Sequence, residues 1–565
     1  MGTSQDFPSF SVVINTYNRA EGLRHTIMAL LQLDYPRFEI VVVNGPSTDH
    51  TTQVLAKFPD RIKVLDCPVR NLSISRNIGI AAAAGELVAF IDDDALPEPE
   101  WLRQLAAGYG DPKVGATGGK VYDHTGYNFQ YQYSTADRLG NAQWQLSEPT
   151  PELNCPGSTR FPYLQGTNTS FRRSALIEIG GFDEEFEFYL DETDVCLRMG
   201  DAGYLVRQLP DAYVHHKFLP SHIRDENRIT KYRYPVVKNK IYFSLKNGRG
   251  VAPLRDIIVD ALKFAISHQD DVEYHIAHGN LPESSRQMYT DEIEKALEDG
   301  LQRGLAPGRK FITQDTLNKH SRPFLQALNE DEVARLSRRR TVVLVSKDYP
   351  PGQAGGIATF NKDLAVALAA QGSNVHVIAE SHDINRVDLE EGVWVHRLVM
   401  RPLDHSAPAL QRGIPPQIWQ WSAIALEETH RIASHHTVHV VETPIWDCQG
   451  AAFLLHGEWP LVVSLQTSLL FWLESHPELS SDPQWMACFG TPMLNLEREL
   501  LMECDAARSI SAAIGSDIER AYRFNFAKGQ AVVAHLGMVD VPYRATTPNV
   551  GTALTVLFVG RLEHR

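Results

Sequence analysis

The chain has 565 residues, of which 43% are hydrophobic and 22% charged, and a formal net charge of −15 at pH 7. This length can form two or three hydrophobic cores, and the acidic balance excludes a general affinity for nucleic acid. The first residues, MGTSQDFPSF, lack the basic start and apolar core of a signal peptide, and the most apolar long segment, residues 451–473, is interrupted by charged residues and a proline. We therefore expect a cytoplasmic protein without a membrane span, and leave peripheral attachment to the inner face of a membrane open.

Strand-like and helical stretches alternate from Phe10 onward. The runs SVVINTY, FEIVVVNGP and RIKVLD have the apolar, β-branched composition of strands, and residues 23–33 and 51–58 between them have helical character. This βαβαβ order predicts a parallel sheet covered by helices. We expect an α/β domain over residues 1–250.

Polar side chains gather where the predicted strands end, which is where open α/β sheets bind ligands. The residues in these positions are Thr16, Asn18 and Arg19 after the first strand, Asn44 and Asp49 after the second, and Arg76 near a helix start. For Thr48 and Asp49 taken alone, capping of the following helix is the stronger interpretation. Together, these side chains can line one cleft.

Three consecutive aspartates, Asp92 to Asp94, follow an apolar run in AFIDDDALP. Carboxylates packed so closely repel each other unless a cation lies among them, so this run predicts a divalent metal site. Oxygen ligands favour Mg²⁺ or Mn²⁺, and the usual companion of these ions is a substrate phosphate.

A series of motifs lies between Phe10 and His216: SVVINTYNR, EIVVVNGPSTD, SRNIGI, FIDDDA, GTNTSFRR, GGFDE, DETDVCLR and AYVHH. In this order they resemble the inverting family-2 glycosyltransferases of the GT-A fold. The resemblance implies transfer of a sugar from a nucleotide-sugar donor to a glycan or lipid-linked glycan acceptor, in the biosynthesis of a surface polysaccharide or another glycan. One departure is NGPS after the second strand, where relatives often have two acidic residues. It weakens Asn44 and Asp49 as contacts for the base and ribose.

The resemblance also implies roles at the donor side. Asp92 would lie towards the ribose or the metal, Asp94 would be the direct metal ligand, and a late histidine would complete the metal site. The motif AYVHHK offers His215 for that ligand, with His216 as the alternative, because adjacent strand residues point to opposite faces. The implied donor-binding residues are Thr16, Asn18, Arg19, Asn44, Asp49, Arg76, Asp92 and Asp93.

An acceptor hydroxyl must lose its proton as it attacks the anomeric carbon, which requires a general base. The family places this base in the acidic pair of DETDVCLR, and alignment favours Glu192 over Asp191. Asp191 can alternatively cap the following helix, and Asp194 can pair with Arg198 at i+4. Capping and catalysis can coexist in this cluster. The residues expected near the acceptor are Gly166, Thr167 and Asn168.

Residues 251–339 contain many helix formers and no strand-like alternation, and we expect a helical connector there. The βα rhythm then restarts with a strand over 341–346, the loop PPGQAGG, a helix over 358–371, and the strands NVHVIAE, VHVVE and PLVVSLQ. This order predicts a second parallel α/β domain over residues 340–552.

The glycine pair Gly355 and Gly356 would let backbone amides approach an anion at a helix N-terminus. With VVETPIWDCQGAAFLL, SISAAIGSDIERAY and VLFVGRL, this loop resembles the N-terminal Rossmann-like domain of the retaining family-4 glycosyltransferases of the GT-B fold. The resemblance implies a phosphate contact from Arg561 and a donor site mainly in a following domain, of which residues 553–565 would be the start. A departure is Gln466, where many relatives carry a histidine. We therefore expect the second module to be incomplete and inactive in the chain as given.

The chain is thus predicted to be a bifunctional glycosyltransferase, and two alternatives stay open. A sugar nucleotidyltransferase has a related core but needs a glycine-rich, basic loop after the first strand, which NTYNRAEG does not provide. A non-catalytic scaffold that binds a glycan or a nucleotide would use the aspartates only for a structural cation. The presence of both the metal residues and the acidic pair favours the enzyme.

Overall fold

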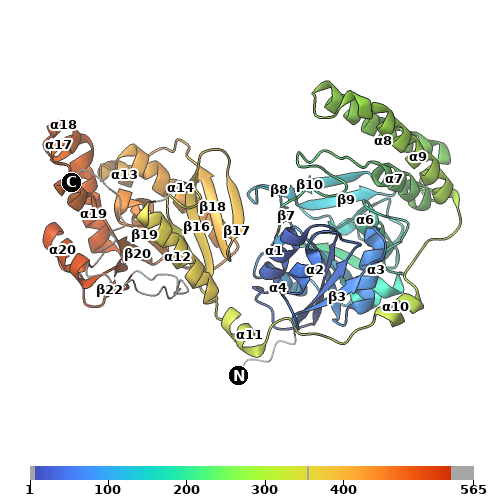
Figure 1. The fold of residues 1–565 in the computed structure, drawn as a ribbon, viewed down its shortest axis with the longest axis horizontal. Helices are drawn as coiled ribbons and strands as arrows, with labels where there is room; N and C mark the ends of the chain where they lie inside the picture. The colour runs from blue at the N-terminus through green and yellow to red at the C-terminus, as the bar shows by residue number, and fades with distance from the viewer. Residues whose placement is uncertain (1–6, 353–354, 536–565) are drawn as a thin grey trace, which may run out of the picture. The chain divides into compact units, whose positions relative to one another are not determined.

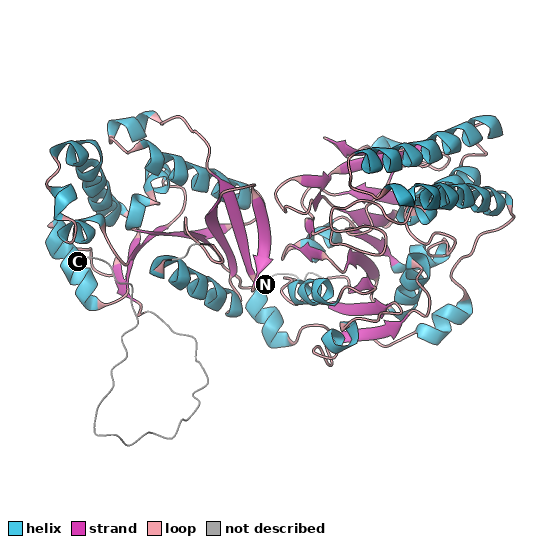
Figure 2. Cartoon of the chain, turned by 45° about the horizontal axis from the view of Figure 1, so that its top comes forward, coloured by secondary structure: helices cyan, strands magenta, loops and turns pink. Residues whose placement is uncertain are grey.

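The computed structural model describes residues 7–352 and 355–535, and the chain divides into two compact units, residues 1–338 and 339–565 (Figure 1). Both units are α/β structures, in which helices cover the faces of strands (Figure 2). Among the helices of the described residues, none combines the length and the apolarity needed to cross a membrane.

The first unit is built on a seven-stranded sheet with the strand order β13-β6-β12-β4-β1-β2-β3. Its strands are β1 (Phe10–Thr16), β2 (Phe38–Asn44), β3 (Ile62–Asp66), β4 (Leu87–Asp92), β6 (Val114–Gly118), β12 (Thr169–Arg172) and β13 (Leu205–Gln208). Strands β1 to β4 are mutually parallel as predicted, whereas β12 runs antiparallel to both of its neighbours, β4 and β6. The sheet is therefore mixed and not purely parallel.

Side chains of the central strands are buried on both faces of this sheet. Val13 and Val41 belong to one hydrophobic core, and Val12 and Val42 belong to the other, as the period of two along a strand requires. One core is covered by α1 (Ala20–Leu30), α2 (Thr51–Leu55) and α4 (Trp101–Ala107), and the other by α3 (Leu72–Ala82), α5 (Arg173–Glu178), α6 (Asp191–Asp201) and α7 (Tyr234–Asn247).

Two smaller sheets complete the first unit. One has the order β5-β14-β7-β8, and its strands are β5 (Ala95–Pro97), β14 (Val214–His216), β7 (Val121–Tyr122) and β8 (Phe129–Tyr131). The other joins β10 (Ala142–Leu146), β9 (Tyr133–Asp137) and β11 (Arg160–Pro162). Because His216 pairs with Ala95, the first of these sheets brings β14 beside the aspartate run.

Most of the residues predicted as a connector are helical, and residues up to 338 belong to the first unit. They form α8 (Leu254–Ala277), α9 (Arg286–Leu305), α10 (Gln314–His320) and α11 (Glu330–Leu336). Helices α8 and α9 share a hydrophobic core with α7. The chain then returns to the main sheet, where Ala327 N donates to Phe38 O at 2.9 Å and Arg61 pairs with Glu332 at 2.6 Å.

The second unit contains an eight-stranded sheet with the order β17-β18-β16-β15-β19-β20-β21-β22. Its strands are β15 (Thr341–Val345), β16 (Asn374–Ser381), β17 (Arg386–Glu390), β18 (Val393–Val399), β19 (Val438–Pro444), β20 (Leu461–Leu465), β21 (Ala506–Ser509) and β22 (Ala531–Val533). All neighbours are parallel except β17 and β18. From β18 to β21 the order follows the doubly wound pattern 3-2-1-4-5-6.

The helices of the second unit connect these strands. They are α12 (Gly356–Ala370), α13 (Ala407–Gln411), α14 (Pro416–Ala433), α15 (Ala451–His456), α16 (Leu469–Glu474), α17 (Pro477–Ser480), α18 (Pro483–Trp485), α19 (Thr491–Glu503) and α20 (Ala512–Tyr522). Gly355 is the N-cap residue of α12, as the predicted loop-to-helix junction requires. Arg561 and the predicted domain start at residue 553 lie outside the described residues, and the GT-B assignment stays a prediction.

Candidate functional site

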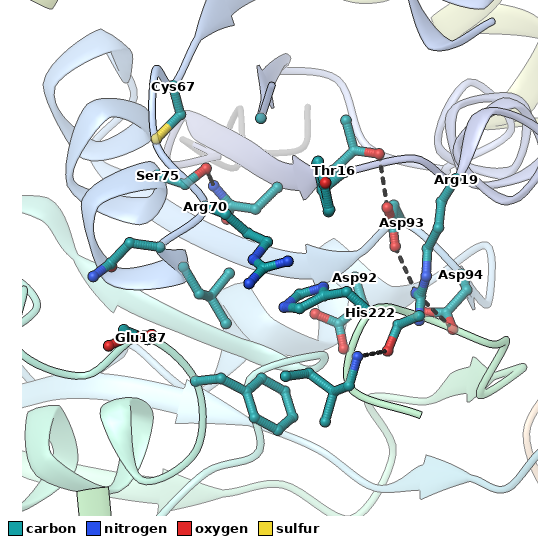
Figure 3. A pocket seen from close by; sticks show the side chains of 18 of the residues that line it. Thr16, Arg19, Cys67, Arg70, Ser75, Asp92, Asp93, Asp94, Glu187 and His222 are labelled. Carbon is teal, nitrogen blue, oxygen red and sulfur yellow. Dashed lines mark hydrogen bonds and ion pairs between the residues drawn. The ribbon is translucent and has the colours of Figure 1, made fainter. Parts of the chain in front are cut away.

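A cleft of about 800 Å³, open to solvent, lies at the carboxyl ends of β1 and β4 in the first unit. Predicted site residues that line it are Thr16, Arg19, Asp92, Asp93 and Asp94 (Figure 3). The parallel register explains the convergence, because Asn15 of β1 lies opposite Asp92 of β4.

The three aspartates have different environments. Asp93 Oδ2 accepts a hydrogen bond from Thr16 Oγ1 at 2.7 Å, and Asp93 Oδ1 accepts one from Arg19 Nη1 at 2.8 Å. Asp94 Oδ2 accepts from Leu219 N at 2.7 Å and pairs with Arg19 Nη1 at 2.9 Å, whereas Asp94 Oδ1 is buried and accepts no hydrogen bond. Asp93 thus stabilises the turn after β4 through two side-chain contacts. One buried oxygen of Asp94 accepts no hydrogen bond and can contact a ligand.

Asp92, Asp94 and His216 can each offer one ligand atom to a cation, and these atoms lie within 4.8 Å of one another. His216 Nε2 is 3.4 Å from Asp94 Oδ1 and 3.7 Å from Asp92 Oδ2. His216 Nδ1 lies 2.9 Å from Gln130 Oε1, which can only accept a hydrogen bond, so Nε2 presents its lone pair to the carboxylates. Two carboxylates and one imidazole suit a divalent cation, and Mn²⁺ better than Mg²⁺, which prefers oxygen.

The prediction that His215 completes the metal site is wrong, and the alternative, His216, faces the aspartates. The two residues point to opposite faces of β14. His215 Nε2 lies 3.1 Å from Glu98 Oε1, and its ring stacks on Tyr122 with 4.5 Å between centroids. His215 therefore supports the small sheet.

The predicted acidic pair begins α6. Tyr189 and Leu190, the two residues before it, have φ angles of 74° and 64°, which non-glycine residues rarely adopt. Asp191 is 2% exposed and bonds to Arg76, and Asp194 forms the predicted pair with Arg198 at 2.7 Å. The alternative that Asp191 caps α6 does not hold, because Leu190 is the N-cap residue and no side chain caps this end.

Glu192 is the more accessible member of the pair, with 19% of its side chain exposed. Its Oε2 lies 3.7 Å from Arg76 Nη1. Burial, and next the charge of Asp191, raise the pKa of Glu192 well above its ordinary value. A carboxylate with a raised pKa is a stronger base, as abstraction of a hydroxyl proton requires.

Four predicted donor-binding residues do not line the cleft: Asn18, Asn44, Asp49 and Arg76. Asn18 Oδ1 accepts from Thr48 N at 2.7 Å, and Asn44 Oδ1 accepts from Ser47 Oγ at 2.8 Å. Asp49 accepts from Ala20 N, at the start of α1, and from Thr51 N, both at 3.1 Å. Asp49 thus bonds the first amides of α1 and α2, although the N-cap residues of these helices are Arg19 and His50.

The residues predicted near the acceptor have two kinds of environment. Asn168 is fully buried, its Nδ2 donates to Lys120 O and Ala212 O at 2.9 Å, and its Oδ1 accepts from Trp101. Asn168 cannot touch an acceptor, and that prediction is wrong. Gly166 lies against Arg76, since a Cβ there would be 2.4 Å from Arg76 Nη2, and Thr167 Oγ1 is buried without a hydrogen bond.

Several cleft residues were not predicted. Figure 3 shows Arg70 and His222 pointing into the same space as Asp92. Burial, and next the charge of Arg70, lower the pKa of His222 to about 4. Arg224 lies over the Phe218 ring at 3.6 Å, and its buried Nε has no hydrogen-bond partner. The basic residues that follow AYVHH could have indicated a contribution to the site. The path of this loop could not be predicted, because its sequence has no periodicity.

A family model described as Glycosyl transferase family 2 matches residues 11–180. The glycosyltransferase AglE of Haloferax volcanii is 30% identical over 226 residues, which cover 38% of this chain and 68% of that protein. The probable glycosyltransferase YdaM of Bacillus subtilis is 26% identical over 219 residues, covering 37% and 50%. The pre-mycofactocin glycosyltransferase of Mycobacterium tuberculosis is 30% identical over 212 residues, covering 36% and 42%. The chain thus spans about half the length of the last two relatives.

Among solved structures, the mannosyltransferase PcManGT from Pyrobaculum calidifontis, in complex with GDP-Man and Mn²⁺, is 20% identical with a TM-score of 0.35. The alignment covers 53% of this chain and 88% of that one. No site residue is transferred from this similarity.

Proposed function

This chain belongs to the family 2 glycosyltransferases, and we propose that its first unit moves a sugar from a nucleotide-sugar donor to a hydroxyl of a glycan or lipid-linked glycan, with inversion at the anomeric carbon. The observation that carries the proposal is the cluster of Asp92, Asp94 and His216 inside the cleft. The leaving group of a nucleotide sugar is the nucleoside diphosphate, and its departure needs positive charge beside the phosphate oxygens.

Asp92, Asp94 and His216 would hold Mn²⁺ or Mg²⁺ at the floor of the cleft. When bound, such a cation neutralises the negative charge that develops on the leaving diphosphate. The buried Oδ1 of Asp94 accepts no hydrogen bond and lies 3.4 Å from His216 Nε2, so a cation held by both groups would supply the missing contact. Thr16 and Arg19 support the site by holding Asp93 and Asp94 in place.

Arg70, His222 and Arg224 line the same cleft and would contact the donor. The guanidinium groups offer charged donors to phosphate oxygens, and the neutral His222 offers one further donor. Tyr17, also in the cleft, presents an aromatic ring on which a nucleobase can stack. The donor-binding roles expected for Asn18, Asn44 and Asp49 are not part of this proposal.

Glu192 would act as the general base. The acceptor oxygen attacks the anomeric carbon as its proton passes to the Glu192 carboxylate, and the bond from that carbon to the phosphate oxygen breaks. The nucleoside diphosphate leaves with the electron pair, and attack from the opposite face inverts the configuration. The raised pKa of Glu192 favours proton uptake at this step.

The test is release of nucleoside diphosphate from a panel of UDP-, GDP- and dTDP-sugars with Mn²⁺, Mg²⁺ or EDTA. We expect release from one class of donor, loss of release in EDTA, and loss in both Asp94→Ala and Glu192→Gln. The competing scaffold function predicts binding of a nucleotide without release from any donor. Activity that is unchanged in EDTA would contradict the metal role.

Three expectations from the sequence stay predictions: a role in surface polysaccharide biosynthesis, a cytoplasmic location with contact to a membrane, and a family-4 character of the second unit. The doubly wound strand order of that unit is compatible with the last of these.

A further inference from the structure

Arg76 is a buried cation that the sequence assigns to the donor, yet, like Asp191 and Glu192, it does not line the donor cleft. It lies on α3 with 4% of its side chain exposed and bonds to Asp191. Its guanidinium carbon is 5.0 Å from the centroid of the Phe182 ring and 5.7 Å from that of Phe90. Burial removes water from this guanidinium group. The aromatic rings and the carboxylate compensate for the lost hydration energy.

The same guanidinium group reaches the second carboxylate of the pair. Arg76 Nη1 contacts Asp191 Oδ2 and is 3.7 Å from Glu192 Oε2, so one nitrogen lies beside both acids. Gly166 closes another side, since even a Cβ at that position would clash with Nη2. Arg76 has no room to turn towards the cleft without breaking these contacts.

The backbone before the pair is held as tightly as the side chains. Tyr189 and Leu190 are both left-handed, and the Tyr189 ring stacks on Phe264 of α8 at 6.2 Å. Asn239 of α7 donates to Phe188 O at 2.6 Å. Strained residues persist where their surroundings determine the conformation, and here they direct Asp191 into the protein and leave Glu192 partly accessible.

We propose that Arg76 is a positioning residue for the general base: it neutralises Asp191 and holds the Glu192 carboxylate at the acceptor side, and it does not bind the donor. The inference rests on the proposed function of Glu192. Without the guanidinium group, two adjacent carboxylates would share one buried place, and they could not both stay ionised at neutral pH.

The ionisable groups around Glu192 come from several elements. They are Arg76 on α3, Asp191 and Cys196 on α6, Tyr189 in the preceding loop, and Tyr163 after β11; Asp92 at the end of β4 acts on Arg76. Arg76 is the cation of this set, and its removal should favour the protonated form of Glu192. Removal of the Asp191 charge should favour the ionised form.

The test compares Arg76→Met, Arg76→Lys and Asp191→Asn with the unaltered chain. The assays are nucleotide-sugar hydrolysis, with water as the acceptor, and calorimetric binding of UDP and GDP with Mn²⁺. We expect Arg76→Met to lower kcat about tenfold or more at pH 7 and to move the acid limb of kcat up by about one pH unit. Asp191→Asn should move the limb down, and Arg76→Lys should stay close to the unaltered chain. KM and the nucleotide Kd should change less than about twofold, because Arg76 is outside the cleft.

Arg198→Met is the matched control, because Arg198 also pairs with a carboxylate of α6 and contacts no proposed site residue. Arg198→Met should not change the pH at which the acid limb of kcat lies. If Arg76→Met weakened nucleotide binding tenfold with an unmoved limb, or if both variants moved the limb equally, the proposal would be wrong. Should Arg76→Met fail to fold, Asp191→Asn and Arg76→Lys still decide the question by the direction of their shifts.

A readout without turnover separates this inference from the proposed function. The infrared band of the protonated Glu192 carboxyl, assigned by difference from Glu192→Gln, can be titrated in each variant. If no donor is cleaved by the unaltered chain, the proposed function fails; an unmoved infrared titration in Arg76→Met and Asp191→Asn contradicts the role of Arg76 itself.

Discussion

A buried carboxylate lies at each end of the main sheet of the first unit, and the two carboxylates differ in their hydrogen-bond partners. Glu39, near the amino end of β2, is fully buried, and all its contacts come from the protein. Its partners are Ser11 Oγ at 2.6 Å, Ala84 N at 2.8 Å, Leu325 N at 2.8 Å and Lys63 Nζ at 2.7 Å. Asp94, beyond the carboxyl end of β4, is 3% exposed and keeps one oxygen without a hydrogen bond.

The two environments distinguish a structural carboxylate from a functional one. Removal of one partner of a buried, fully hydrogen-bonded pair destabilises the fold, whereas a buried oxygen without a hydrogen bond has room for a contact with a ligand. Substitution of Asp94 should therefore affect mainly the catalytic rate, and substitution of Glu39 should affect mainly the free energy of unfolding.

Asp94→Ala should give the largest effect. Loss of a direct metal ligand is expected to lower the rate of nucleoside diphosphate release by about 10³-fold or more, because charge stabilisation at the leaving group is the main contribution to catalysis. The free energy of unfolding without added metal should fall only moderately, because Leu219 N loses its acceptor but Arg19 keeps Asp93 as a partner. Steady-state kinetics with Mn²⁺ and a thermal melt measure both quantities; a variant that kept the full rate would contradict the comparison.

Glu39→Gln should have the reverse effect. It leaves Lys63 buried without its carboxylate, which is expected to cost about 3 kcal/mol of unfolding free energy. Urea denaturation measures the loss, and binding of Mn²⁺ with UDP by calorimetry should be unchanged in the folded protein. A stable Glu39→Gln protein with weakened metal binding would reverse the roles assigned to the two ends.

The adjacent histidines provide a smaller and sharper test. His216→Ala removes a proposed direct ligand and should lower the affinity for Mn²⁺ by more than the about 10–100-fold that loss of an outer-sphere partner costs. His215→Ala, the matched control on the same strand, should leave that affinity unchanged because it removes only contacts to Glu98 and Tyr122. Titration of Mn²⁺ followed by electron paramagnetic resonance distinguishes the two.

The pH dependence of kcat should report the base. A general base works only when ionised, so kcat should fall about tenfold per pH unit below the pKa of Glu192. Because burial and Asp191 raise this pKa, the limb should lie above that of an ordinary glutamate, about 4.3. Rate measurements from pH 5 to 9 locate it. A limb at the ordinary value would contradict the assignment.

Much of the fold followed from local patterns. The predicted strands and helices of the first 66 residues occur within a few residues of their expected bounds, because apolar periodicity reflects burial directly. The antiparallel β12 was not predicted, since TSFR does not reveal the direction of its neighbours. The packing of α10 and α11 on the first unit also depends on contacts between residues far apart in the chain, such as Arg61 with Glu332.

The residue types that gather at the sheet edge follow from local sequence, because strand ends and their order are local properties. The aspartate run, the acidic pair and the two adjacent histidines are all visible there. Hydrogen bonds and ion pairs between distant segments direct each side chain. They select the histidine that faces the aspartates, engage Asn168 fully in the fold, and hold Arg76 against Asp191 and outside the cleft. One oxygen of Asp94, left without such a bond, is what distinguishes the candidate site from the satisfied carboxylate of Glu39.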